Sequence, residues 1–551
     1  MVSVSAHLAD LDRTAGRSGR ATRRKEQGSH YTPPALVGWI LDRAMTGGTV
    51  PARVLDPACG AGNFLVAFAE RGIARGIPVE EMLAQRVFGI DIDATAVKLC
   101  RALLIALLPA STPTAARARV EAALRRHVVV GDALERSIAE ITGLDAFDLV
   151  VGNPPFLNQL EVATTASRAR AARIRERSEG IVSGYADLSA AFLLEACRHT
   201  APGGSVGFVM PQSFLAAADT SAMRAWIAGN TQIRALWTAD EMIFEDAGVR
   251  VCALVAECAG ASGARPIERA FGAGFSAIRE VPCGAITTGE PWSTLFAEAR
   301  GVPEIEVEEA PLLASVAMAT ADFRDQFYGL RGAVVDRRDA DEARYPKLIS
   351  TRHVDLAHCG WGEKPVRLLF ERYAAPRADR ALLARDAKMA AWMRSRLVPK
   401  VLVATQTKVL EAVVDEKGEW LPVVPILTVT PRDGGEIDLW MLAAAIASPV
   451  ATTEAARLAY GAALSPGAIK LSAKQLLALP LPRDREAWRE SARFVREASK
   501  ARDAHARGEA LQRFAEASCR AHRLDGAAAR RVLAFWSARA SGAAPKTTTP
   551  A

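Results

Sequence analysis

The first half of the chain alternates short apolar, β-branched runs with longer stretches whose apolar residues recur at helical spacing. The apolar runs predict strands at residues 53–56, 87–91, 127–131, 147–152, 205–210, 232–237 and 249–257. The stretches between them predict helices, among them 63–75, 95–108, 186–199 and 220–228. Because buried strands that alternate with helices are typical of a parallel sheet covered on both faces, the pattern predicts a doubly wound, Rossmann-like α/β fold.

The pattern changes after this alternating region. Pro-punctuated β-like runs follow at 345–351, 397–405, 412–414 and 422–429, with a helical piece at 438–448. Ala-, Arg- and Glu-rich sequence with helical spacing then predicts one or two C-terminal helices. The predicted organisation is a flexible basic arm at 1–25, a first α/β domain at 26–258, a connecting region with some structure at 259–310, a mixed α/β domain at 311–483, C-terminal helices at 484–540 and a disordered tail at 541–551.

Composition narrows the class of protein. Of 551 residues, 50% are apolar and 24% are charged, which excludes a mainly disordered chain. No apolar run reaches the roughly 18 residues that a membrane span needs, and the first residues lack the apolar segment of a secretory signal. The eight cysteines form no C-x-x-C pair, so we expect free thiols in a reducing, cytoplasmic environment and no metal site. The formal net charge of +7 is compatible with a nucleic-acid partner without requiring one.

Three predicted strands end in a carboxylate. Asp56 opens the turn Asp-Pro-Ala-Cys-Gly-Ala-Gly, whose small residues let the backbone approach a ligand. The turn has neither G-x-G-x-x-G nor a phosphate-loop lysine, so a cation such as an amino group suits Asp56 better than a pyrophosphate does. Asp91 can accept hydrogen bonds from both ribose hydroxyls, and Asp132 can accept one from an adenine amine. The structural alternatives are an ordinary β–α turn at Asp56 and helix N-caps at the others, a role that Asp93 fits better than Asp91 does.

The sharpest motif follows the strand predicted at 147–152, where Asn153-Pro154-Pro155-Phe156 stands. The prolines fix φ and remove two donors, which leaves carbonyl oxygens beside an amide and an aromatic ring. An exocyclic amine on a planar ring would find two acceptors and a stacking surface there. A plain Pro-Pro turn is the alternative, but the three strand-end acids favour a binding site.

With these motifs, the chain resembles the gamma-ordered adenine-N6 DNA methyltransferases of bacterial restriction–modification systems. In that order the cofactor motifs precede Asn-Pro-Pro-aromatic, and a target-recognition domain follows. Residues 28–34, Gly-Ser-His-Tyr-Thr-Pro-Pro, are similar to the motif that opens the family's fold. The resemblance covers about residues 25–258 and is looser over 311–483, where the segments similar to recognition domains are 345–349, 398–403 and 471–476.

The resemblance implies S-adenosylmethionine as cofactor and gives roles to individual residues. The implied cofactor-binding residues are Thr32, Asp56, Ala58, Gly60, Asp91, Ile92 and Asp132. The implied catalytic residues are Asn153, Pro154, Pro155 and Phe156, with Phe156 stacking on the target base. Phe244 is the best candidate for a second aromatic at the base, although Trp237 is also near. Cys59 receives no catalytic role, because a small buried thiol suits its position.

The predicted function is therefore methyl transfer from S-adenosylmethionine to N6 of a flipped adenine in double-stranded DNA. The alternatives are a methyltransferase that acts on RNA or on protein glutamine, and a non-catalytic DNA specificity protein. We expect no nuclease within the chain, because residues 1–25 are too few to hold one and Asp386-Ala387-Lys388 is a lone match. A separate restriction endonuclease stays open as a partner, and the DNA target sequence is not readable from the chain.

Several arginines follow the Asn-Pro-Pro-Phe motif, at positions 168, 170, 173, 175 and 177. Two interpretations remain open for them. They form either a solvated helix face or a mobile loop that closes on DNA phosphates.

Overall fold

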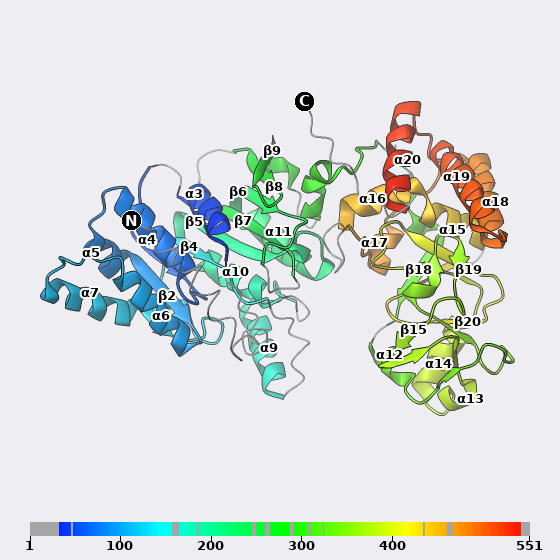
Figure 1. Cartoon of the computed structure of the whole chain (residues 1–551), viewed down its shortest axis with the longest axis horizontal. Helices are drawn as coiled ribbons and strands as arrows, with labels where there is room; N and C mark the ends of the chain where they lie inside the picture. The colour runs from blue at the N-terminus through cyan, green and yellow to red at the C-terminus, as the bar shows by residue number, and fades with distance from the viewer. Residues whose placement is uncertain are drawn as a thin grey trace. The chain divides into compact units, whose positions relative to one another are not determined.

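The computed structural model describes residues 32–45, 48–156, 165–183, 187–244, 249–258, 265–286, 291–306, 310–322, 324–432, 436–459 and 467–540. The predicted arm at 1–25, residues 28–31 of the opening motif and the predicted tail at 541–551 lie outside these residues, as does the side chain of Arg168. The chain divides into two compact units, Met1–Trp292 and Ser293–Ala551 (Figure 1).

The described part of the first unit is built on a nine-stranded sheet with the order β3-β2-β1-β4-β5-β7-β6-β8-β9. Strands β1 to β5 pair in parallel, whereas β7 runs antiparallel to both β5 and β6. The α/β class is confirmed, with a mixed rather than a purely parallel sheet. The strands are β1 (Val54–Asp56), β2 (Val87–Asp91), β3 (Val128–Val130), β4 (Phe147–Gly152), β5 (Thr200–Pro211), β6 (Thr231–Thr238), β7 (Val251–Cys258), β8 (Ile267–Phe271) and β9 (Ser276–Val281).

The helices of the first unit pack apolar faces onto this sheet. Gly207 on β5 shows how close the packing is, since a Cβ there would lie 2.5 Å from Cγ2 of Ile40. Phe64 and Phe68 of α4 are buried in the same core. The helices are α3 (Pro34–Ala44), α4 (Asn63–Ala74), α5 (Val79–Glu81), α6 (Ala94–Ile105), α7 (Thr114–His127), α8 (Ile138–Thr142), α9 (Thr165–Arg177), α10 (Leu188–Arg198) and α11 (Ser221–Asn230).

Strands β8 and β9 fall inside the range 259–310, which the sequence assigned to a connecting region. They extend the first sheet instead, with β8 parallel to β6 and β9 antiparallel to β8. The apolar pattern is weak here because β9 is an edge strand whose side chains are mostly exposed. The sequence therefore placed the end of the sheet too early.

The described part of the second unit holds two four-stranded sheets, β10-β21-β18-β19 and β11-β17-β12-β20, and two hairpins, β13-β14 and β15-β16. The strands are β10 (Ala317–Ala321), β11 (Val334–Asp336), β12 (Lys347–Ile349), β13 (Val354–Asp355), β14 (His358–Cys359), β15 (Val366–Leu368), β16 (Glu371–Tyr373), β17 (Pro376–Ala378), β18 (Lys400–Ala404), β19 (Glu411–Asp415), β20 (Trp420–Pro422) and β21 (Leu427–Pro431). The helices are α12 (Arg324–Gly329), α13 (Arg380–Leu383), α14 (Ala387–Arg396), α15 (Leu439–Ala447), α16 (Pro449–Ala459), α17 (Ala473–Leu477), α18 (Arg485–Lys500), α19 (Ala504–Ala521) and α20 (Gly526–Ala540).

Residues 484–540, all of them described, form three helices, so the expectation of one or two was too low. Aspartates mark the starts: Asp484 accepts from Glu486 N, Asp503 from Ala506 N and Asp525 from Ala527 N. These caps were readable in the sequence, but continuous helical spacing concealed the breaks. Trp488 of α18 connects the C-terminal helices to α15, because its Nε1 donates a hydrogen bond to the carbonyl of Met441 at 2.8 Å.

Among the residues that the structure describes, no single helix is long and apolar enough to cross a membrane. The pair α15 and α16, which bends by 54°, meets the length and composition test only when the two helices are taken together. Both helices are largely buried in the core of the second unit.

Candidate functional site

The strand-end motifs lie along one edge of the first sheet. In the register of the sheet Leu55 pairs with Val150, and Asp56 pairs with Gly89. Strands β2, β1 and β4 are parallel, so their carboxyl ends open on the same side. Ligands of open α/β sheets bind outside such carboxyl ends.

Asp56 is a buried carboxylate at the end of β1, with 2% of its surface exposed. Its Oδ1 accepts a hydrogen bond from Ala58 N at 3.1 Å. Gly152, the last residue of β4, lies beside it, since a Cβ there would come within 3.0 Å of Asp56 Oδ1. Burial, together with the nearby Asp91 carboxylate and against the hydrogen bond from Ala58, raises the pKa of Asp56 to about 8. A hydrogen-bonding cation at this position would favour the ionised form.

Asp91 holds the turn after β1 against the end of β2. Its Oδ2 accepts from Gly60 N at 2.7 Å, and its Oδ1 accepts from Asp93 N at 2.8 Å. Gly60 has a φ of +51°, which favours glycine, and a Cβ there would meet nothing within 4 Å. Asp93 is the N-cap of α6 and accepts from Thr95 N. Asp93 thus takes the capping role, which leaves Asp91 as the carboxylate that faces the turn.

Asp132 already has a cationic partner. Its Oδ1 accepts from Leu134 N at 2.9 Å, and its Oδ2 accepts from a guanidinium nitrogen of Arg170 at 2.6 Å. Arg170 lies on α9, which follows the Asn-Pro-Pro-Phe motif. No local pattern indicates this pairing, because 38 residues separate the two partners.

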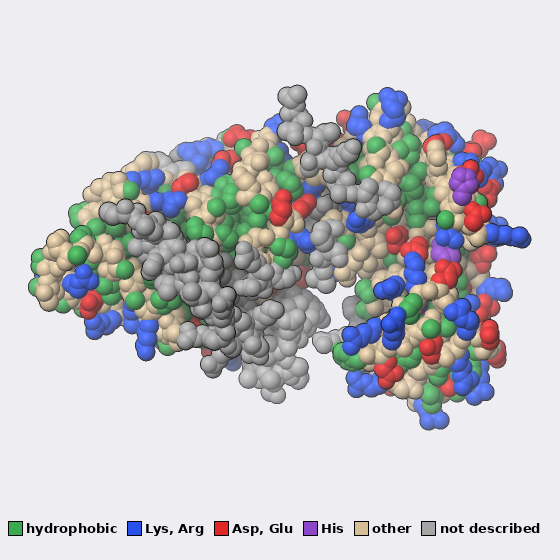
Figure 2. Space-filling model, in the orientation of Figure 1, with side chains coloured by type: hydrophobic (Ala, Val, Ile, Leu, Met, Phe, Trp, Pro, Cys, Tyr) green, Lys and Arg blue, Asp and Glu red, His purple; other side chains and the backbone are tan. Residues whose placement is uncertain are grey.

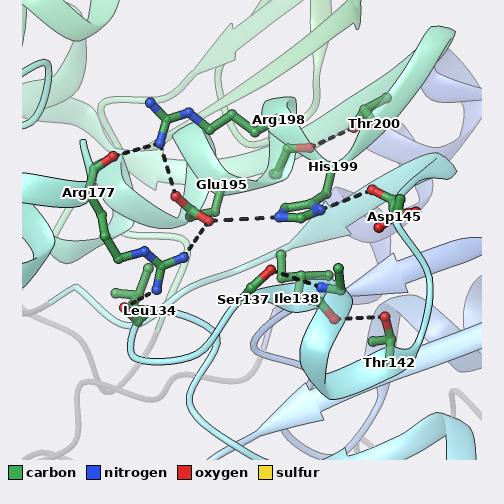
Figure 3. A network of polar contacts seen from close by, with 12 residues as sticks. Leu134, Ser137, Ile138, Thr142, Asp145, Arg177, Glu195, Arg198, His199 and Thr200 are labelled. Carbon is green, nitrogen blue, oxygen red and sulfur yellow. Dashed lines mark hydrogen bonds and ion pairs between the residues drawn. The ribbon is translucent and has the colours of Figure 1, made fainter. Parts of the chain in front are cut away.

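Further ion pairs hold α9 against the same unit. Arg173 donates to Glu135 at 2.9 Å, and Arg177 donates to Glu195 at 2.8 Å. Figure 3 shows Glu195, on α10, between the guanidinium groups of Arg177 and Arg198. The segment is thus a helix, and three of its arginines pair with acids of the same unit. This favours the helix-face interpretation over a mobile loop that closes on phosphates.

The Asn-Pro-Pro-Phe motif begins directly after β4. Asn153 and Pro155 are half-buried, Pro154 is buried, and Phe156 is half-buried against the apolar core of the first unit. The ring of Phe156 meets that of Phe244 edge-on, with centroids 6.4 Å apart and planes at 71°. The sequence predicts that both aromatics stack on one base; the fold brings the two rings into contact with Phe244 only 4% exposed, and their stacking on a base stays a prediction.

Trp237, the alternative to Phe244, faces elsewhere. It is fully buried on β6, and its Nε1 donates to the carbonyl of Gly272 at 3.0 Å. Its ring packs on Phe275, with centroids 5.1 Å apart. Trp237 is therefore a core residue, and Phe244 is the aromatic that contacts Phe156.

The remaining candidates differ in exposure. Thr32 is buried just before α3, whereas Ala58 is half-buried in the turn after β1. Ile92 is 68% exposed beside Asp91, which leaves an apolar surface available at the sheet edge. Cys59 is buried next to Cys100, and a hydrogen bond between the two thiols, together with burial, raises the pKa of Cys59 well above its usual value. Its thiolate is therefore disfavoured.

The isolated acid-x-lysine match in the second unit has a structural explanation. Asp386 is the N-cap of α14 and accepts from the backbone N–H groups of Lys388 and Met389 at 2.8 and 2.9 Å. Both donors are N–H groups in the first turn of the helix, where no carbonyl of the helix can accept them. The arrangement accounts for Asp386 without any catalytic role.

Comparisons with known proteins find relatives of the first unit. Residues 19–260 match the family described as N-6 DNA Methylase. A type I restriction enzyme methylase subunit, MjaIX of Methanocaldococcus jannaschii, is 29% identical over 195 residues, which are 35% of this chain and 30% of that protein. The type II methyltransferase M.TthHB8I of Thermus thermophilus is 31% identical over 226 residues, 39% of this chain and 41% of that protein. The chain thus spans less than half the length of these relatives.

A solved structure resembles more of the chain. It is that of the type IIL restriction-modification enzyme MmeI in complex with DNA, with a TM-score of 0.53 and 13% sequence identity. The match covers 92% of this chain and 74% of that one. At this identity the likeness concerns the fold alone.

Proposed function

We propose that the chain is a site-specific DNA methyltransferase that methylates N6 of adenine in duplex DNA, since residues 19–260 match the family described as N-6 DNA Methylase. The observation that carries the proposal is the Asn153-Pro154-Pro155-Phe156 turn. It lies at the end of β4 with Phe244 against its ring, next to the strand that ends in Asp56. The proposed partners are double-stranded DNA and a separate restriction endonuclease.

The residues at the sheet edge fit S-adenosylmethionine as methyl donor. Asp56 is a buried acid that an α-amino group would hold in its ionised form. Each oxygen of Asp91 accepts one of the two backbone N–H groups and keeps a lone pair for a ribose hydroxyl. Gly60 leaves open space beside this turn, and Ile92 offers an exposed apolar side chain for an adenine face. Thr32 and Ala58 are proposed to complete the cradle.

Asp132 is proposed to accept a hydrogen bond from the cofactor's adenine amine, and Arg170 now occupies one of its oxygens. Replacing Arg170 by glutamine is expected to increase S-adenosylmethionine affinity several-fold, because the carboxylate no longer has to leave an ion pair. Isothermal titration calorimetry of the full chain measures the change. Arg173→Gln is the matched control, since Arg173 pairs with Glu135 instead. An unchanged or lower affinity in Arg170→Gln would remove Asp132 from the cofactor site.

The Asn-Pro-Pro-Phe turn is proposed to hold the target amine. The side-chain oxygen of Asn153 and the carbonyl of Pro154 accept its two N–H groups, which localises the nitrogen lone pair that the purine ring otherwise delocalises. When bound, the cofactor supplies an electrophilic methyl group on a sulfonium. The same two oxygens then stabilise the positive charge that develops on the nitrogen, more in the transition state than in the ground state. Pro155 fixes the turn, because its ring locks φ.

The adenine must leave the duplex to reach this turn. Extruding a base costs a few kcal/mol, and stacking on an aromatic ring offsets part of that cost. Phe156 is proposed to supply this stack. Phe244 supports the ring edge-on, which limits the orientations that Phe156 can adopt.

Transfer of tritiated methyl groups from S-adenosylmethionine tests the proposed function. The purified full chain is expected to label plasmid duplex DNA, and long-read sequencing of that DNA is expected to find N6-methyladenine in one recurrent motif. RNA and a glutamine-bearing protein are included as competing substrates. Labelling of either one instead of duplex DNA would identify the alternative enzyme class, and labelling of none would favour a non-catalytic specificity protein.

A further inference from the structure

The hairpin formed by β15 and β16 has an unusual turn. Leu368 pairs with Glu371, so the connection consists of Leu369 and Phe370 alone. Both have positive φ, +50° and +74°. Two-residue hairpin loops with two positive φ angles are strongly biased towards Asn-Gly, because a Cβ crowds the backbone carbonyl there, glycine has none, and asparagine offsets the strain with local hydrogen bonds. Two large apolar residues at these positions act against local stability, which is a common mark of a functional segment.

The hairpin holds the Phe370 ring outward. Phe370 is 75% exposed, whereas Val366 and Leu368 on the same hairpin are buried. Those two side chains pack into a core with Leu348, and Leu369 packs against that core. The exposed ring therefore extends from an anchored element. The part of the second unit around α12, α14 and β15 carries many Lys and Arg side chains, with Asp and Glu among them (Figure 2).

Two arginines flank the ring. Arg367 and Arg372 pair directly across the hairpin, and both are exposed. Like charges opposite each other destabilise a strand pair, unless a counter-charge is supplied from outside. Arg367 Nε also donates to the carbonyl of Phe370 at 3.3 Å, which keeps that guanidinium at the turn. The nearby Glu371 accepts a hydrogen bond from the hydroxyl of Tyr373 at 2.7 Å.

We infer that this hairpin tip is a DNA-contacting wedge. Phe370 inserts against the bases in a groove, and Arg367 and Arg372 bind the phosphates on either side. Proteins that kink or open a duplex use apolar wedges beside basic side chains in this way. A second copy of this chain is a less suitable partner for the tip, because the arginines of the two tips would face and repel each other. The inference rests on the proposed function, since it supplies that enzyme with a contact to its DNA.

The turn itself provides a discriminating variant. Replacing Phe370 by glycine relieves the strain of its positive φ and leaves Leu369 packed on the core, so the thermal midpoint of the full chain is expected to stay the same or to rise. Affinity for a duplex is expected to fall roughly tenfold, the loss typical of removing one base-contacting aromatic. Met318→Ala is the matched control, because Met318 is a partly exposed apolar residue on β10 of the same unit.

The phosphate contacts proposed for Arg367 and Arg372 are tested by the salt dependence of DNA affinity. The double variant Arg367→Gln and Arg372→Gln is expected to flatten the slope of log affinity against log salt by about two, one for each released phosphate contact. Arg489→Gln with Arg530→Gln, on α18 and α20, controls for net charge. Unchanged affinity in the turn variant, or an equal slope change in the control, would overturn the wedge.

Two further results separate this inference from the proposed function. If the wild-type chain methylates duplex DNA and the turn variant binds DNA equally well, the wedge is wrong and the proposed methyltransferase function stands. A wild-type chain that neither binds nor methylates duplex DNA removes both. If sedimentation finds a wild-type dimer and a monomeric turn variant, Phe370 serves self-association and the wedge is wrong.

Discussion

Replacing Asn153 by alanine is expected to lower methyl transfer to duplex DNA by a factor of about 10² to 10³, the loss typical of removing one preorganised charge-stabilising group. The side-chain oxygen of Asn153 is the proposed acceptor for one N–H of the target amine. Without it, the nitrogen lone pair stays delocalised in the purine and the developing positive charge loses one of two facing dipoles. The backbone carbonyl of Pro154 remains, so a residual rate is expected. Single-turnover transfer of tritiated methyl measures the change.

The prediction separates catalysis from binding. S-adenosylmethionine affinity should stay within a few-fold of the wild-type value, because the proposed cofactor residues lie before α3 and at the ends of β1, β2 and β3, whereas Asn153 follows β4. Asn230→Ala provides a control, since Asn230 is exposed at the end of α11 and donates to the carbonyl of Trp226. Near-normal turnover of Asn153→Ala would contradict the assignment of the Asn-Pro-Pro-Phe turn. A loss of cofactor affinity equal to the loss of rate would assign Asn153 to the cofactor instead.

Sequence patterns located the proposed site well because it depends on strand ends. The structure has β2 at Val87–Asp91 and β4 at Phe147–Gly152, the bounds that the apolar runs predict. A parallel sheet brings the carboxyl ends of such strands to one edge, so Asp56, Asp91 and Asn153 follow from pattern and topology together. The approach of Phe244 to Phe156 was predicted from the family resemblance alone. The roles of all these residues remain predictions until they are tested.

Other features depend on contacts between distant residues, which no local pattern encodes. The pairing of Arg170 with Asp132 requires α9 to fold back onto the loop after β3, and a run of arginines does not reveal its partner. The edge strand β9 lacks an apolar face and so lacks a signal. The turn at Leu369 and Phe370 also lacks a sequence signal, because neither residue type favours a two-residue turn with positive φ. Sequence propensity disfavours that turn, and the surrounding core imposes it.

The second unit depends on a buried ion pair that the sequence did not reveal. Lys400 on β18 has none of its side chain exposed and Asp415 on β19 has 2%, and the two groups are in direct contact. Asp415 also accepts from Gly418 N at 2.9 Å and from Trp420 N at 3.0 Å, which fixes the connection from β19 to β20. Gly418 has a φ of +73°, and a Cβ there would lie 2.6 Å from a backbone carbon of Val398. The ion pair therefore stabilises a tightly packed turn.

Replacing Lys400 by methionine is expected to destabilise the second unit by about 3–5 kcal/mol, because it leaves the Asp415 carboxylate buried without its cation. Hydrogen exchange and thermal unfolding of the full chain measure the effect. Arg520→Gln is the control, since its pair with Glu490 is exposed and should contribute at most about 1 kcal/mol. An unfolding midpoint equal to that of the control would contradict the prediction.

The same variant distinguishes the roles of the two units. Duplex affinity is expected to fall in Lys400→Met at temperatures where the second unit unfolds, because the proposed wedge at Phe370 belongs to that unit. Cofactor affinity is expected to persist there, since Asp56 and Asp91 belong to the first unit. If both affinities are lost together, the two units unfold cooperatively, which contradicts the separate unfolding of the second unit. If duplex affinity persists after the second unit unfolds, DNA is held mainly by the first unit.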